Sequence, residues 1–273
     1  MDTPPNLFET DTLALRRARA DGTAWFLQDA ALDEIHERIQ DVNRTFKNVA
    51  IIGPRANIWA ERLGLEATCI PDRDFLGLGE AQYDLIIHAM ALHWANDPIG
   101  QLVQMRRALV PDGLMLAVSF GGQTLNELRI SFAQAETRVL GGISPRVAPM
   151  GELREMGALL QRAQLALPVA DALPLTVSYE NALRLMHDLR AMGETNVMCA
   201  RHKTPISKPL LAEVMREYQS SFAVEGRIQA SFELIFLSGW APSRTQQQPL
   251  KPGSAQVRLA DALGTLEINP DKP

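Results

Sequence analysis

The chain has 273 residues, of which 46% are hydrophobic and 22% are charged, a balance typical of a soluble globular protein with one large or two small domains. Its formal net charge of −5 gives no indication of nucleic-acid binding. Cys69 and Cys199 form neither a zinc motif nor a disulfide framework, so a reducing compartment is expected. No apolar run approaches the length of a membrane span, which argues against an integral membrane protein.

The N-terminus lacks the apolar core of a signal peptide. Residues 13–20, LALRRARA, have the composition of part of a transit peptide. Asp2, Glu9 and Asp11 argue against that interpretation, because transit peptides contain few acidic residues. The segment therefore predicts a cytoplasmic protein of bacterial type.

The first predicted helix covers residues 29–46, where apolar residues recur at helical spacing. Residues 1–48 are accordingly expected to form an N-terminal helical segment. Residues 49–53, VAIIG, predict a short buried strand that ends on a glycine. A helix should follow, with Pro54 in its first turn, where a missing N–H costs nothing.

Further strands are predicted at residues 66–72 and 84–88, followed by a helix from residue 97 that ends before a turn at residues 111–113. A strand at residues 114–120 completes an alternation that predicts a parallel α/β sheet. The second half predicts helices at 124–140, 150–165, 182–192 and 208–222, and strands at 173–179 and 230–240. The tail from Pro242 is expected to be an irregular surface segment, in which residues 246–248 either bind a partner or are simply solvated.

Several segments resemble known proteins. The segment YDLIIHAMALHWANDPIGQLVQMRRALVPDGLMLAVSF resembles the fourth strand, helix and fifth strand of class I S-adenosylmethionine (SAM) methyltransferases. The segments FGGQTLNELRISFAQAETRVLGGISPRVAP, LMHDLRAMGETN and GWAPSRTQQQPLKPGSA resemble the methyltransferase-like assembly factors (arginine hydroxylases) of respiratory complex I, which occur in mitochondria and related bacteria. This resemblance runs from about residue 30 to the end.

The resemblance implies a Rossmann-like class I methyltransferase fold. The sheet would be mostly parallel with an antiparallel last strand, and N-terminal helices would precede it. The methyltransferase-like domain would cover residues 49–241, with a helical insertion at about residues 180–225, and a tail would follow at 242–273. The resemblance also implies SAM as cofactor, the quinone-proximal iron–sulfur subunit of complex I as partner, and hydroxylation of an arginine on that subunit.

A SAM site needs glycines after the first strand and a carboxylate at the end of the second strand, which grips the ribose. Here only Gly53 follows the first strand. Pro54 removes a backbone donor, and the charge of Arg55 would either repel the sulfonium or pair with the carboxylate of SAM. Each lost hydrogen bond to a charged group costs about 1.5–3 kcal/mol, so weak SAM binding is expected.

The interval from Gly53 to Tyr83 is only 31 residues long. Two helices, two strands and their connections would need roughly 45, so one strand–helix unit is expected to be missing. The segment CIPDRDFLGL best matches the third strand and its loop, which deletes the second strand and places Asp72 or Asp74 near the adenine. The less economical alignment makes Asp72 the ribose carboxylate and deletes the third strand.

The resemblance assigns eight candidate cofactor contacts, which are Gly53, Asp72, Asp74, Phe75, His88, Ala89, His93 and Trp94. It assigns six candidate substrate-facing residues, which are Arg129, Arg146, His187, Asp188, Arg190 and Glu194. No catalytic residue is assigned, and the sequence contains no metal-binding triad or paired His and Cys arrangement.

Each candidate has a structural alternative. His93 and Trp94 form either a pocket floor or a packing contact at a helix entry, and residues 72–74 either an adenine clamp or a solvated turn. The loop at 141–149 would cap the mouth of the site. His187 and Arg190 share one helix face, ahead of a C-cap at Gly193, and form either a substrate wall or a charged surface. Glu136 is expected in an internal salt bridge, and Cys69 is expected to be buried in a strand.

Three functions remain open from the sequence. The first is an enzyme that uses SAM or hydroxylates a complex I arginine, supported by the intact region around His93 and Trp94. The second is a non-catalytic assembly protein on the same fold, supported by the short interval and the Pro-Arg turn. The third is a small-molecule or acyl-carrier carboxyl methyltransferase, which requires a deep apolar pocket beside the cofactor.

Overall fold

The computed structural model describes residues 5–246, 257, 261, 264 and 265, and the chain divides into two compact units, Met1–Pro242 and Ser243–Pro273. Most of the expected tail, including residues 247 and 248, lies outside the described residues. Within the described part of the chain, no helix is both long enough and apolar enough to cross a bilayer.

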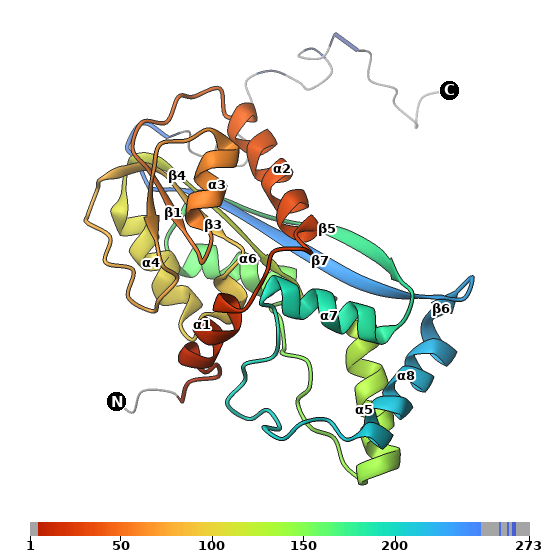
Figure 1. Ribbon diagram of the computed structural model, residues 1–273. Coiled ribbons are helices and arrows are strands. Elements are labelled where there is room, and N and C mark those ends of the chain that lie inside the picture. The colour runs from red at the N-terminus through yellow and green to blue at the C-terminus, as the bar shows by residue number, and fades with distance from the viewer. Residues whose placement is uncertain (1–4, 247–256, 258–260, 262–263, 266–273) are drawn as a thin grey trace. The chain divides into compact units, whose positions relative to one another are not determined.

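The helices and strands alternate through the first half, as the sequence predicts (Figure 1). In chain order they are α1 (Thr10–Ala18), α2 (Phe26–Asp41), β1 (Val49–Ile52), α3 (Ala56–Leu63), β2 (Ala67–Ile70), β3 (Tyr83–Ala89), the 3-10 helix η1 (Leu92–Trp94), α4 (Pro98–Ala108) and β4 (Leu109–Phe120). The second half contains α5 (Asn126–Leu140), α6 (Leu153–Arg162), β5 (Ala166–Tyr179), α7 (Ala182–Met192), α8 (Lys208–Phe222), β6 (Ala223–Val224) and β7 (Arg227–Trp240).

The strands form one sheet in the order β2-β1-β3-β4-β7-β5, with the short β6 paired to β7. β1 runs parallel to β2 and β3, and β3 runs parallel to β4. β7 is the last strand in the chain and lies antiparallel to both β4 and β5. A mostly parallel sheet with an antiparallel last strand, preceded by helices, confirms the predicted fold class.

One strand–helix unit is missing, as the short interval predicted. Only α3 and β2 lie between β1 and β3 in the chain. β2 pairs with β1 along its whole length, from Val49 opposite Ala67 to Ile52 opposite Ile70. In space β2 therefore occupies the position next to the first strand, which is the position that the less economical alignment gives it.

The expected burial of Cys69 is wrong, because β2 is the edge strand of the sheet. Its burial pattern leaves Thr68 and Cys69 exposed, and both cysteines of the chain are exposed free thiols. An edge strand has a neighbour on one side only, so its side chains keep more contact with water.

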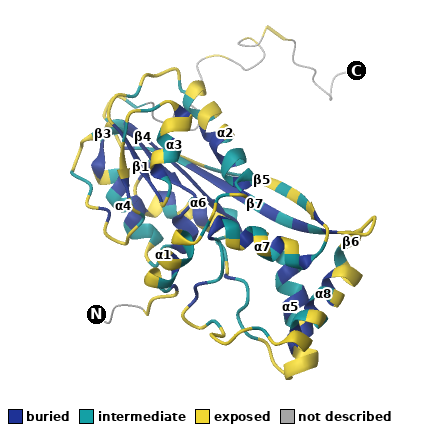
Figure 2. Ribbon diagram, in the orientation of Figure 1, coloured by how far each residue is buried: buried dark blue, intermediate teal, exposed yellow. Residues whose placement is uncertain are grey.

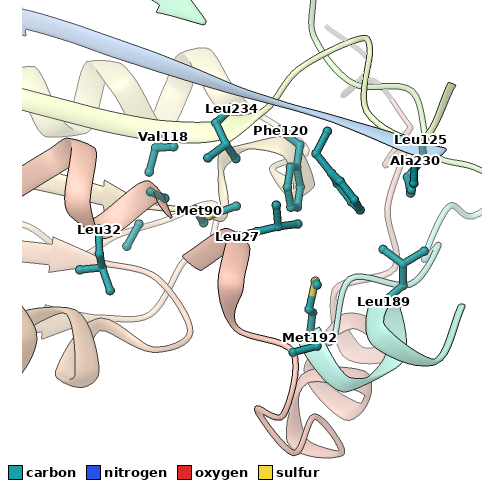
Figure 3. Close-up of a cluster of buried hydrophobic side chains, with 14 of the residues drawn as sticks. Leu27, Leu32, Met90, Val118, Phe120, Leu125, Leu189, Met192, Ala230 and Leu234 are labelled. Atoms are coloured by element: carbon teal, nitrogen blue, oxygen red, sulfur yellow. The ribbon is translucent and has the colours of Figure 1, made fainter. Parts of the chain in front are cut away.

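The core lies on both faces of the sheet, which explains the continuous apolar sequence of β1. Val49 and Ile51 join the cluster under α2, α3, α5, α7 and α8, whereas Ala50 and Ile52 join the cluster under α4 and α6. Figure 2 shows the resulting buried strands at the centre of the unit. Figure 3 shows side chains of α2, β4, α7 and β7 meeting in the first cluster.

The predicted helical insertion is confirmed, with α7 and α8 beginning and ending at the expected residues. The Asn181 side chain accepts a hydrogen bond from Arg184 N, and Ser207 caps α8 in the same way. Gly193 adopts the left-handed conformation at the end of α7 (φ 81°), as predicted.

Four local expectations are wrong. The strand predicted at 173–179 is twice as long, because β5 begins at Ala166 and pairs with β7 from there. The helix predicted at 29–46 ends at Asp41. Pro54 lies before α3, whose N-cap is Arg55, because Gly53 N still bonds to Ile70 O and continues the β1–β2 ladder. Residues 111–113 belong to β4, since the backbone of residues 112 and 113 exchanges hydrogen bonds with Ala241 beyond β7.

Candidate functional site

A pocket of about 500 Å³ lies where β1, β2 and β3 end, at the edge of the sheet where ligands of open α/β folds bind. We call it the edge pocket. Pro54, residues 71–74 and Trp94 line it together with residues of α1. Of the candidate cofactor contacts, the edge pocket is lined by Asp72, Asp74 and Trp94.

Asp72 is already engaged by a cation. Arg17 on α1 donates from Nη1 to Asp72 Oδ2 at 2.6 Å, and the two side chains are only 12% and 11% exposed. The other nitrogens of Arg17, Nε and Nη2, are buried and have no hydrogen-bond partner among the described residues. Arg17 was not among the candidates from the sequence, where the Arg-Arg pair was interpreted only as a feature of transit peptides.

Gly53 is explained by packing inside the sheet. A Cβ added there would lie 2.7 Å from the carbonyl oxygen of Ala89, and the backbone has φ +152°. The glycine is therefore required by the close approach of β3, whether or not a ligand is present. Arg55 places its guanidinium 4.0 Å from the centre of the Trp25 ring, in a cation–π contact.

The remaining cofactor candidates lie around the edge pocket without lining it. Phe75 is 80% exposed, whereas Ala89 is buried. His88 is fully buried, with Nε2 2.9 Å from Gln101 Oε1, and its Nδ1 has no hydrogen-bond partner in the part of the chain that the structure describes. Burial lowers the pKa of His88 to about 4, so its imidazole is neutral near pH 7.

His93, Trp94 and Glu194 form a buried polar cluster beside the edge pocket. Glu194 Oε2 lies 3.0 Å from His93 Nε2 and accepts a hydrogen bond from Trp94 Nε1 at 2.6 Å. Phe120 N lies 3.4 Å from His93 Nδ1, which favours the tautomer that carries its proton on Nε2. Burial alone would raise the pKa of Glu194, but His93, Arg17 and the Trp94 hydrogen bond outweigh it and lower that pKa.

Two further cavities are lined partly by residues of the loops that follow α5 and α7. These two loops lie side by side (Figure 1). The apolar pocket, of about 190 Å³, is walled by Trp94, Leu125, Leu128 and Phe132. The cationic groove, of about 510 Å³, is lined by four arginines from α1, α7 and the two loops. Asn196 joins the two loops, because its side chain donates to the carbonyl oxygens of residues 145 and 146.

The predicted substrate-facing residues fall into two groups. Arg146 and Arg190 line both cavities, His187 lines the cationic groove, and Glu194 lines the apolar pocket. His187 and Arg190 thus share a face of α7, as their spacing predicts.

Arg129 and Asp188 line neither cavity. Arg129 donates to the carbonyl oxygen of Thr124 at 3.3 Å. Asp188 lies near Tyr179, where it adds to the effect of burial in raising the pKa of the tyrosine.

The expected internal salt bridge of Glu136 is confirmed. Its fully buried carboxylate accepts from Arg146 Nε and from Ser144 N and Oγ, each at 2.6 Å. These bonds tie the loop after α5 to the helix and orient Arg146. Among the residues that the structure describes, no group of three or more His, Cys, Asp or Glu side chains is arranged to hold a metal ion.

The strand order and the antiparallel last strand define a class I methyltransferase-like protein. No family model matches the chain. Among solved structures, the chain resembles the YcgJ protein of Bacillus subtilis with a TM-score of 0.50 and 14% identity, over 79% of this chain and 99% of that one. At that identity the likeness shows the fold alone.

Curated relatives define the family. The chain is 30% identical to the mitochondrial arginine-hydroxylase NDUFAF5 of Danio rerio, over 86% of this chain and 81% of that protein. It is 37% identical to NDUFAF5 of Dictyostelium discoideum, over 69% of this chain but only 44% of that protein. It is also 30% identical to the malonyl-[acyl-carrier protein] O-methyltransferase of Methylovorus, over 73% of this chain and 61% of that protein. The chain belongs to the NDUFAF5 arginine-hydroxylase family.

Proposed function

We propose that this chain acts in the assembly or modification of respiratory complex I, as a methyltransferase-fold protein with impaired use of SAM. The observation that carries the impairment is the buried ion pair between Arg17 and Asp72. The carboxylate that would grip the cofactor ribose is held by α1 instead. Membership in the NDUFAF5 family supports the link to complex I, and the quinone-proximal iron–sulfur subunit is the proposed partner. In a bacterium the protein would act in the cytoplasm.

Three features of the edge pocket do not fit SAM. Asp72 is engaged, Pro54 offers no backbone donor, and Gly53 is explained by its contact with Ala89. Losing the ribose contact alone would cost about 1.5–3 kcal/mol, or roughly ten- to a hundredfold in affinity.

The edge pocket and the apolar pocket also bear on the other two functions. A non-catalytic assembly protein needs no cofactor and agrees with the engaged Asp72. A carboxyl methyltransferase needs both SAM and a deep apolar pocket, and the apolar pocket here holds only about 190 Å³. Impaired SAM binding therefore counts against the carboxyl methyltransferase.

Complementation tests the proposal. In a strain that lacks the chain, complex I is measured on native gels and by NADH oxidation in membranes. The wild-type chain should restore complex I, and Asp72→Asn should restore it equally, provided that circular dichroism shows the variant to be folded. Unchanged complex I in the deletion strain would refute the link. A folded Asp72→Asn variant that fails to complement would show that the protein needs the Asp72 carboxylate, which contradicts the proposed impairment.

A further inference from the structure

The cationic groove has a strong imbalance of charge. Arg16, Arg146, Arg190 and Arg201 all line it, and none of its lining residues is acidic. The arginines come from α1, from the loop after α5, from α7 and from the loop after α7, so the fold brings together cations that are far apart in the sequence.

Two of these arginines are neutralised from outside the groove. Arg146 bonds to Glu136 at 2.6 Å, and Arg201 bonds to Glu9 at 2.7 Å. Glu9 also bonds to Lys203 at 2.7 Å, so its charge is shared.

The other two arginines have no ion pair among the described residues. Arg16 donates hydrogen bonds to the neutral oxygens Thr195 Oγ1 and Asn196 O. Its interaction with Glu9 is electrostatic only, without a hydrogen bond. Arg190 is exposed on α7. Burial lowers the pKa of Arg16, and the charges of Arg201 and Arg190 lower it further, so these guanidinium groups repel one another.

The groove continues into the apolar pocket. Phe132, Arg146, Met186, Arg190, Asn196 and Ile206 line both cavities. A ligand with its charged group between the arginines would therefore extend its remaining atoms toward Leu125, Leu128 and Phe132. A cationic group at the same place would meet Arg146 and Arg190 and be repelled.

We propose that the cationic groove and the apolar pocket together bind an organic anion, a carboxylate or phosphate monoester attached to an apolar body. Arg16 and Arg190 bind the anionic group, and the apolar pocket takes the body. Glu194 also lines the apolar pocket, but its carboxylate is buried and accepts hydrogen bonds from His93 and Trp94. The proposal stands on the groove alone and needs neither SAM nor a complex I subunit.

Calorimetric titration with octanoate tests the proposal, at fixed ionic strength. We expect saturable binding that weakens about tenfold or more in Arg190→Gln and in Arg16→Gln. The matched control is Arg184→Gln, on the same helix, whose side chain is 69% exposed and pairs with Glu180 outside the groove. This control removes the same charge and should leave the affinity unchanged. Arg190 is exposed, so its replacement should not disturb folding.

Three probes of the same chain length separate charge from apolar contact. Octanol and octylammonium should each bind at least tenfold more weakly than octanoate. Octyl phosphate tests a phosphate monoester in place of the carboxylate, and the tighter binder of octyl phosphate and octanoate indicates which anionic group the site prefers. Absence of binding by both octanoate and octyl phosphate, equal binding by octylammonium, or an affinity that Arg190→Gln and Arg184→Gln change equally would overturn the proposal.

Discussion

Replacing Glu194 by Gln removes one buried charge while keeping the volume of the side chain and an oxygen that accepts hydrogen bonds. The carboxylate receives two hydrogen bonds, from His93 Nε2 at 3.0 Å and Trp94 Nε1 at 2.6 Å, and is 7% exposed. A hydrogen bond to a charged group contributes about 1 kcal/mol more than a neutral one. Two such bonds predict that Glu194→Gln lowers the free energy of unfolding by about 2 kcal/mol at pH 7.

The pH dependence of this loss has a definite sign. The pKa of Glu194 in the folded protein lies below its ordinary value of 4.5, so its carboxylate stabilises the folded state above that pH. The stabilisation is lost as the pH falls through the folded-state pKa. The difference between wild type and Glu194→Gln should therefore be largest near pH 7 and shrink below pH 4.5.

Urea unfolding, followed by tryptophan fluorescence at several pH values, measures the difference. The control is Glu180→Gln, just before α7, whose side chain is 68% exposed and should contribute less than about 0.5 kcal/mol. Equal stability of wild type and Glu194→Gln at pH 7 would refute the reasoning. A difference that does not change with pH would refute it too, because a packing defect alone has no such dependence.

Two other substitutions test neighbouring parts of the sheet. Because burial lowers the pKa of His88 to about 4, the wild-type protein should lose about 2 kcal/mol of stability through this group between pH 7 and pH 5. His88→Gln keeps a hydrogen-bond donor for Gln101 and should remove that loss. If stability depends on pH in the variant as it does in wild type, the buried neutral imidazole is contradicted. Gly53→Ala should lower the free energy of unfolding by about 2 kcal/mol or more, because its Cβ would clash with Ala89 O. Gly64→Ala, at φ +65° in open space, should cost about 1 kcal/mol in the same unfolding assay. Equal costs would contradict the packing explanation of Gly53.

The fold was predictable where the signals are local. The apolar run of β1 needs burial on both faces, and the sheet supplies it. Asn181, Gly193 and Ser207 are residues that favour helix caps, so the limits of α7 and α8 follow from the sequence. Glu136 and Arg146 are ten residues apart, at the end of a helix and in the stiff loop that follows it, and their pairing was within reach of the same reasoning.

The candidate site was predictable only as separate pieces. His93 and Glu194 are 101 residues apart and were assigned to different ligands, but the structure joins them in one cluster. Arg17 and Asp72 are 55 residues apart, and their pairing depends on how α1 lies over the sheet edge. Spacing within a segment carries no information on such contacts. The exposure of Cys69 was missed for a similar reason, since only the strand order reveals that β2 lies at the edge.

The most direct test of the proposed loss of cofactor affinity is calorimetric titration of the purified wild-type chain and Asp72→Asn with SAM and with its demethylated product. If Arg17 holds Asp72, neither compound should bind wild type below the millimolar range, and Asp72→Asn should behave in the same way. Micromolar binding to wild type that weakens tenfold or more in Asp72→Asn would contradict the account. It would show that Asp72 leaves Arg17 to grip the ribose and that the edge pocket is a working cofactor site.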